Sequence, residues 1–166
     1  MSELLLLLAA LAVHEAGHYL CAKLVGASLV SFSVTPIGLR LRFDFSRVGY
    51  LAEAFVHAGG SIVGMLAGII AAAFPIRAAH VFCGISLSFG AINLLPVSFF
   101  DGGGIVSAIL SQFFLPDTVW RVSRTVSFGV LSTLWAAVLW SELRVGANLA
   151  LLCFVCGAMI AELFED

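Results

Sequence analysis

The sequence predicts an α-helical polytopic membrane protein with about five transmembrane helices, the third broken, and a small β-hairpin between the first two. Apolar residues make up 61% of the 166 residues and charged residues 11%, whereas soluble domains average about 45–50% and about 25%. A soluble chain this short has too little interior for so much apolar surface, so lipid is the expected solvent. We expect residues 1–166 to form a single membrane-embedded domain. The net charge of −2 says little about partners, and no basic stripe indicates nucleic acid as a partner.

Uncharged runs mark the expected spans, because about 20 residues cross the hydrocarbon core. The predicted crossings are 3–25, 54–76, 78–116, 125–141 and 145–161. The third run is too long for one straight helix. Asn93-Leu94-Leu95-Pro96 ends its first part, since proline removes a donor and disfavours the α region for Leu95, and Asp101 begins a second piece. Broken backbone at membrane depth is tolerated only where it lines a cavity or packs in protein, so we expect this break beside a functional site.

The basic residues predict the orientation of the chain in the membrane. Two of the expected connections hold most of them (Lys23, Arg40, Arg42, Arg47; Arg121, Arg124), whereas the other side holds only Arg77 and Arg144. This asymmetry places the N-terminus outside and the C-terminus in the cytoplasm. His14 precedes Lys23 by nine residues, which at about 1.5 Å per residue puts it roughly 14 Å below the cytoplasmic surface.

Between the first two spans, the hydrophobic period changes to two. Apolar residues alternate with polar ones on both sides of Pro36-Ile37-Gly38 (Val30, Phe32, Val34; Leu39, Leu41, Phe43, Phe45). We therefore expect a β-hairpin over about residues 28–45. Its edge is suited to pair with an extended substrate, and the alternative is a hairpin that only plugs the helix bundle.

The strongest motif is His14-Glu15-Ala16-Gly17-His18, inside the first span. Histidines at i and i+4 stand on one helix face and can bind one Zn²⁺, with Glu15 beside them as general base. Chance alone gives this pattern in about one chain of this length in two hundred. The alternative is that these side chains only pack between helices. Ionisable groups at membrane depth are costly and mark function by default, so we favour a metal site.

The motifs of this chain and their order along the sequence resemble the site-2 protease family of intramembrane zinc metalloproteases. Within that family, the chain is most similar to the sporulation stage IV protein FB subgroup. The matching segments are His14 to His18, Ala58-Gly59-Gly60, Asn93 to Pro96 and Asp101-Gly102-Gly103. The resemblance implies His14, His18 and Asp101 as zinc ligands and Glu15 as the catalytic base. It also implies that Asn93 and Pro96 shape the substrate channel. Gly60 departs from the family, which usually has proline there.

The resemblance further implies the activity and the partners. The expected reaction is hydrolysis of a peptide bond in or near a transmembrane segment of a membrane-tethered protein, such as a sigma-factor precursor, under a membrane-bound regulator. The expected location is the bacterial cytoplasmic membrane or the membrane that surrounds the forespore. Two alternatives stay open: a small membrane transporter, because broken helices with buried carboxylates also occur there, and a non-catalytic membrane protein that binds partners.

Overall fold

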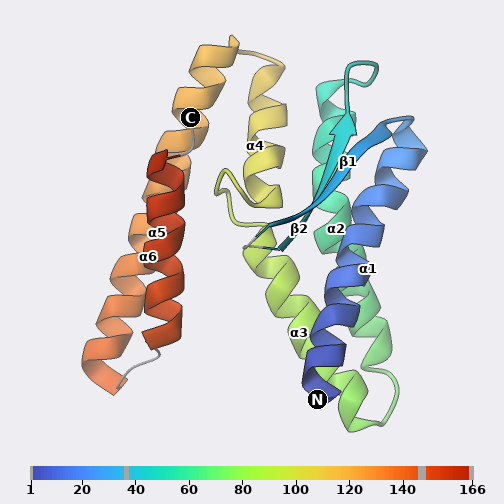
Figure 1. Cartoon of the computed structure of the whole chain (residues 1–166), viewed down its shortest axis with the longest axis vertical. Coiled ribbons are helices and arrows are strands. Elements are labelled where there is room, and N and C mark those ends of the chain that lie inside the picture. The colour runs from blue at the N-terminus through green and yellow to red at the C-terminus, as the bar shows by residue number, and fades with distance from the viewer. Residues whose placement is uncertain (1, 36–37, 146–148, 165–166) are drawn as a thin grey trace.

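The computed structural model describes residues 2–35, 38–145 and 149–164. This described part is mostly helical, with six helices and two strands (Figure 1). In chain order the elements are α1 (Ser2–Val25), β1 (Ser28–Thr35), β2 (Gly38–Asp44), α2 (Tyr50–Ala71), α3 (Arg77–Asn93), α4 (Asp101–Ser111), α5 (Pro116–Val145) and α6 (Leu149–Phe164). Three described helices hold a stretch long and apolar enough to cross a membrane: Glu3–Val25, Tyr50–Ala71 and Pro116–Arg144. The number of five crossings stays a prediction.

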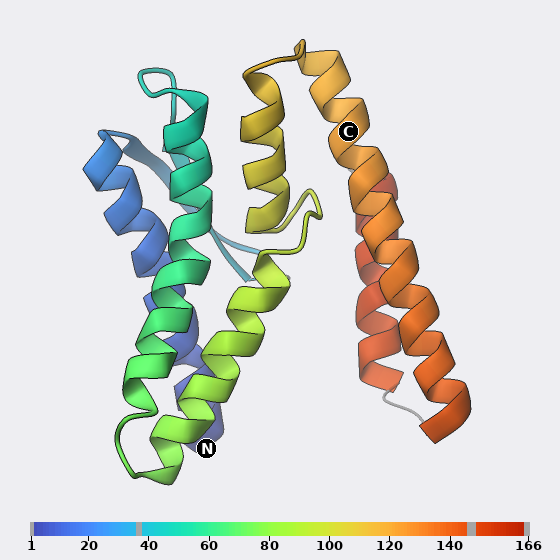
Figure 2. The ribbon, with the colours of Figure 1, turned by 180° about the vertical axis from the view of Figure 1, so that it is seen from behind.

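The helices form two parts that meet around α4. Helices α1, α2 and α3 pack on one another, and α4 packs on α2. Helix α5 pairs with α6 and contacts α4 near the turn that joins α4 to α5. Figures 1 and 2 show this α5–α6 pair standing apart from α1, α2 and α3 over most of its length. The broken segment between α3 and α4 lies in the middle of the molecule, between the two parts.

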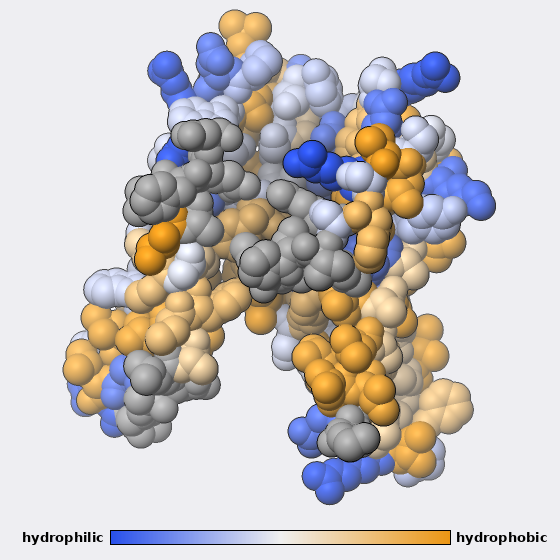
Figure 3. All heavy atoms as spheres, in the orientation of Figure 1, coloured by the Kyte–Doolittle hydropathy of each residue, from blue (hydrophilic) through white to orange (hydrophobic). Residues whose placement is uncertain are grey.

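Large hydrophobic side chains cover the outside of the helices. Leu4, Leu8, Ile70 and Trp140 are all more than half exposed. Figure 3 shows hydrophobic residues over much of the lower halves of both parts, and hydrophilic residues mainly at the upper end and at the lower tips. Exposed apolar surface on this scale is expected when the surroundings are lipid rather than water. The chain is therefore a membrane protein.

Glycines set the crossing of α1 and α2. A Cβ on Gly17 would lie 2.6 Å from the carbonyl oxygen of Gly59, and a Cβ on Gly59 would lie 2.5 Å from Cys21 Sγ. Side chains larger than hydrogen would push the two helices apart, because real Cβ atoms do not approach so closely. Small residues at such crossings are common between membrane helices. The close approach brings the backbone of α2 against the histidine face of α1.

The two helix boundaries that differ most from the predicted spans do so for physical reasons. Helix α2 ends at Ala71 rather than at residue 76, because Pro75 restricts Phe74 before it and cannot donate a helical hydrogen bond. Helix α5 begins at Pro116 rather than at residue 125, because proline fits the first helical position and charged side chains there do not end a helix. The broken segment keeps its expected ends, with α3 ending at Asn93 and α4 beginning at Asp101.

The two strands pair antiparallel, with Phe32 opposite Leu41 and Leu29 opposite Phe43. The register shifts between Leu29 and Ser31, so that Val30 is an extra residue in a β-bulge. The alternation of apolar and polar residues in the sequence did not predict this bulge. The predicted turn at Pro36 and Ile37 lies outside the described residues. Phe43 packs with Phe45 against a small buried cluster of α1 and α2.

Asp44 is the last residue of β2, and its carboxylate accepts a hydrogen bond from the segment that follows the strand. The backbone N–H of Ser46 donates to Asp44 Oδ1 at 2.9 Å. This bond, together with a second one from the Ser46 side chain, holds the pKa of Asp44 below its ordinary value. The turn leads the chain from β2 to the start of α2 at Tyr50.

Candidate metal centre and active site

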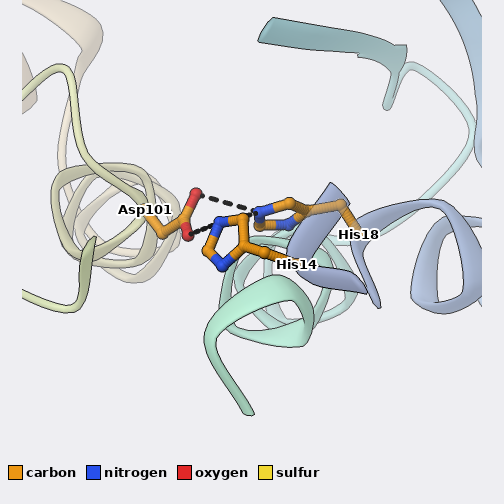
Figure 4. A group of neighbouring side chains, drawn as sticks. All are labelled: His14, His18 and Asp101. Carbon is orange, nitrogen blue, oxygen red and sulfur yellow. Dashed lines mark hydrogen bonds and ion pairs between the residues drawn. The ribbon is translucent and has the colours of Figure 1, made fainter. Parts of the chain in front are cut away.

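Three side chains from two helices meet in the centre of the molecule. His14 Nε2 lies 3.1 Å from Asp101 Oδ2, and His18 Nε2 lies 3.2 Å from Asp101 Oδ1. The two Nε2 atoms lie 3.1 Å apart. Figure 4 shows Asp101 reaching from α4 towards both rings on α1. Both histidines are buried, and the carboxylate of Asp101 is largely shielded.

These distances fit a tetrahedral metal site. With metal–ligand bonds of about 2.0–2.1 Å, two donor atoms of a tetrahedron are about 3.3–3.4 Å apart. The two imidazole nitrogens are 3.1 Å apart, and each lies 3.1 Å or 3.2 Å from a different oxygen of the Asp101 carboxylate, close to that edge length. With one donor atom taken from each residue, the three donors lie within 4.8 Å of one another. Two imidazole nitrogens with one carboxylate oxygen are also donors that zinc accepts, with a fourth position left for water. The ligand role of these three residues stays a prediction.

Two further groups orient these side chains. The backbone carbonyl oxygen of Val56 lies 2.8 Å from His18 Nδ1 and accepts its proton, which leaves the Nε2 lone pair facing Asp101. The buried Ser61 hydroxyl donates to Asp101 Oδ2 at 3.3 Å. Both partners belong to α2, the helix that the glycine crossing brings against α1. Such outer partners fix ring orientation and carboxylate rotation before a metal binds.

Asp101 occupies the first turn of α4 without serving as its cap. The N-cap is Phe100, and Asp101 is the first helical residue, so its carboxylate is directed to the histidines. The following glycines let the chain fold back tightly. A Cβ on Gly103 would lie 2.6 Å from the carbonyl carbon of Val97, and a Cβ on Gly104 would lie 2.6 Å from His57 Cε1. The glycine run after Asp101 is therefore required by close contacts on two sides.

A cavity of about 500 Å³ opens onto these three residues, a size typical of small ligand sites. Glu15 lines the cavity and is half-buried, as expected for a group that exchanges protons there. Asn93 also lines it, and its Nδ2 donates to the Phe89 carbonyl oxygen at 2.9 Å. Pro96 lies in the connection between α3 and α4 and is not among the residues that line this cavity.

Strand β2 borders the same cavity along its edge. Leu41, Arg42 and Phe43 all line it. Successive side chains of a strand point to opposite faces, so a cavity that touches all three meets the edge of the strand. The bulged Val30 of β1 also reaches the cavity. A strand edge beside a candidate active site provides backbone donors and acceptors for an extended chain.

His57 belongs to none of the predicted motifs, and the structure places it at the site. His57 lines the cavity, where its ring lies against Gly104 and 5.9 Å from the ring of Phe45. It shares one face of α2 with Glu53 and Ser61, at successive steps of four residues. This stripe of polar residues in an otherwise apolar helix is the sequence pattern from which His57 and Ser61 could have been predicted as site residues.

Comparison with known proteins identifies a family and a similar fold. The model of peptidase family M50 matches residues 45–134, which is more than half of the chain and includes Asp101. The site-2 protease from Methanocaldococcus jannaschii has a similar fold, with a TM-score of 0.72 and 22% sequence identity over 97% of this chain and 76% of that chain. At this identity the likeness is one of fold. No match was found among curated proteins.

Taken together, the membrane helices, the histidine–aspartate group and the cavity beside it define a metalloprotease built into a membrane fold. The chain belongs to peptidase family M50. The motif His14–His18 precedes the matched segment, which begins at residue 45.

Proposed function

We propose that the chain is a zinc-dependent intramembrane endopeptidase of the site-2 type. The observation that carries the proposal is that two imidazole nitrogens of His14 and His18 and the carboxylate of Asp101 come within metal-binding reach of one another, inside apolar helices and beside Glu15. His14, His18 and Asp101 would hold the zinc ion. When bound there, zinc supplies Lewis-acid activation of water and of a carbonyl group.

The residues of the chain supply proton transfer and orientation. Glu15 accepts a proton from the attacking water and returns it to the leaving amide nitrogen. The Val56 carbonyl holds His18 in one tautomer, and Ser61 holds the carboxylate of Asp101. The surrounding aromatic side chains, Phe89 and Phe100 among them, line the cavity and limit the entry of bulk water.

We further propose that the substrate is a membrane-tethered protein, bound as an extended segment along β2. A peptide bond in a transmembrane helix is shielded by its own hydrogen bonds, so the substrate must unwind before it is cut. The β2 edge beside the cavity offers replacement hydrogen bonds to the unwound segment. By resemblance to the sporulation subgroup, the substrate is a sigma-factor precursor or a similar regulator. The chain would lie in a bacterial membrane with its N-terminus outside, crossing five times.

The test of the activity is cleavage of co-expressed membrane substrates by wild type and by Glu15→Gln. Glu15→Gln is expected to lower the cleavage rate by about 10²–10⁴-fold, the usual contribution of a general base, while purified protein keeps its zinc. Glu3→Gln is the matched control, because it makes the same change at an exposed position of the same helix. Retained cleavage in Glu15→Gln would remove Glu15 from the base role. A protein with neither zinc nor cleavage would favour the transporter or partner-binding alternatives.

The test of substrate binding uses single cysteines on β2. A cysteine at Leu41 or Phe43 is expected to crosslink to a cysteine near the scissile bond of the substrate, and a cysteine at Ile69 on the exposed face of α2 is not. Equal crosslinking at all three positions would show that β2 has no special place in substrate binding.

A further inference from the structure

A second polar cluster lies outside the metal centre and has no part in the chemistry described so far. It consists of Ser98 from the connection between α3 and α4, Ser127 from α5 and Glu162 from α6. Glu162 is 2% exposed and Ser127 is fully buried. We refer to these three residues as the Ser98–Ser127–Glu162 cluster.

Hydrogen bonds link Ser98 to both of the other members of the cluster. The Ser98 hydroxyl donates to Glu162 Oε2, and the Ser98 N–H donates to Ser127 Oγ at 3.2 Å. The two serine Oγ atoms lie 3.4 Å apart. Since Ser98 has one hydroxyl hydrogen and gives it to Glu162, Ser127 is the donor in this last bond. Both hydroxyls are thus satisfied, and the carboxylate receives a bond from the connection between α3 and α4.

This cluster joins the two parts of the molecule. Val97 packs next to it against Leu131 of α5 and Ala158 of α6, and all three are buried. Away from α4 and this connection, the α5–α6 pair stands apart from α1, α2 and α3 (Figures 1 and 2). Figure 3 shows open space between the lower halves of the two parts. A buried carboxylate in a membrane segment is costly and is retained where it has a role.

The connection held by Ser98 continues directly into Asp101. The Val97 carbonyl oxygen accepts the N–H of Phe100 at 2.9 Å, and the Phe100 carbonyl oxygen accepts the N–H of Gly103 at 3.1 Å. A Cβ on Gly103 would lie 2.8 Å from Ser98 Cα, so that the connection lies flat on the first turn of α4. A displacement of Ser98 must therefore move the first turn of α4, and with it the carboxylate that faces His14 and His18.

We propose that Glu162 is a positioning residue, which acts through Ser98 to hold Asp101 at the metal centre. The role needs a hydrogen-bond acceptor at this place, and it does not need the negative charge. The inference rests on the proposed role of Asp101 as a metal ligand, and the experiment separates the two.

The experiment compares zinc retention and substrate cleavage in the full-length protein. Glu162→Leu removes the acceptor, and we expect it to release zinc to a chelator at least about tenfold faster, as outer partners of metal ligands do when lost, with a matching fall in cleavage rate. Glu162→Gln keeps a side-chain carbonyl oxygen and is expected to stay within about threefold of wild type. Ser127→Ala is expected to weaken zinc retention in the same direction, and Ser132→Ala, at an exposed position of the same helix, is the matched control.

A disulfide tests the contact itself without metal or substrate. With the four native cysteines replaced by alanine, Ser98→Cys with Ser127→Cys is expected to form a disulfide under mild oxidation, because the two Oγ atoms are 3.4 Å apart. Ser98→Cys with Ser132→Cys is not expected to form one.

Some outcomes would overturn the positioning role of Glu162, and another would refute the metal site itself. Wild-type zinc retention in both Glu162→Leu and Ser127→Ala would overturn the positioning role, as would a Glu162→Gln variant as defective as Glu162→Leu, or failure of the disulfide. If Glu162→Leu does not fold, the pair Ser127→Ala and Ser132→Ala decides alone. Undiminished zinc binding in Asp101→Ala would instead refute the metal site on which both proposals depend.

Discussion

Gly60 offers the sharpest test of the metal centre, because its substitution changes no chemical group. A Cβ on Gly60 would overlap His18 Nε2 and would lie 2.5 Å from Cδ2 and 2.7 Å from Cε1 of the same ring. Gly64, one turn further along α2, faces His14, and a Cβ there would lie 3.8 Å from the nearest atom of His14, an ordinary contact. Gly60→Ala and Gly64→Ala therefore form a matched pair that places the same methyl group against the two histidines.

The size of the effect follows from these distances. The Cδ2 atom of the His18 ring must retreat from 2.5 Å to about 3.4 Å, where ordinary contact begins, and Nε2 is nearer still, so the ring must shift by at least about 0.9 Å. Metal–ligand distances tolerate only about 0.2 Å, so we expect Gly60→Ala to weaken zinc binding by at least about 100-fold, the upper range for the loss of an outer partner. Both variants gain about 0.5–1 kcal/mol of helix stability from Gly→Ala, so helix propensity cannot explain a difference between them.

The assay is zinc retention by purified protein against a competing chelator, together with cleavage of a membrane substrate. Gly64→Ala is expected to match wild type in both, and Gly60→Ala to lose both while remaining folded. Equal zinc retention in the two variants would refute the close packing of His18 on α2. Equal loss in both would show that any methyl group between α1 and α2 separates the helices, and the argument from His18 would fail.

Three further predictions follow from the contacts of the site. Asp101→Ala is expected to lose zinc and cleavage together, by more than about 100-fold, while Asp101→Glu keeps part of both because it retains a carboxylate; equal behaviour of the two variants in the zinc assay would contradict this. Ser61→Ala is expected to lower zinc affinity about 10-fold or more, whereas Ser86→Ala, which removes a buried hydroxyl with no partner among the described residues, is expected to leave it unchanged. Treatment with a chelator is expected to abolish cleavage, and added Zn²⁺ to restore it, in wild type but not in Asp101→Ala; chelator-resistant cleavage would exclude a metal-dependent reaction.

The central part of the site could be predicted because it follows from local rules. His14 and His18 share a helix face by spacing alone, and the break that precedes Asp101 follows from Pro96 and the glycine run. The sequence places His14 roughly 14 Å below the cytoplasmic surface, and the resemblance to the site-2 protease family adds Asp101 as its partner. The structure then brings their donor atoms within 3.1 Å to 3.2 Å.

The outer partners of the site could not be predicted in this way, because they depend on how α1 and α2 cross. The crossing at Gly17 and Gly59 decides which carbonyl group meets His18 Nδ1 and which hydroxyl meets Asp101. A spacing of glycines predicts that two helices approach closely, but the partner of each glycine follows from the packing. The bulge at Val30 is a similar case, since one extra residue in a strand leaves the alternation of apolar residues almost unchanged.

Glu162 shows why a charge-bounded prediction of membrane spans misses buried acids. The last predicted span stopped at residue 161 because a carboxylate normally marks the approach to water. In the structure α6 continues through Glu162 to Phe164, and Glu162 is 2% exposed. Its hydrogen-bond partner, Ser98, lies 64 residues earlier in a different part of the fold. A charged residue at the end of an apolar run can thus be a boundary or a buried contact, and the choice depends on a partner that no local pattern identifies. The same ambiguity applied to Asp101 until its distance to two histidines could be measured.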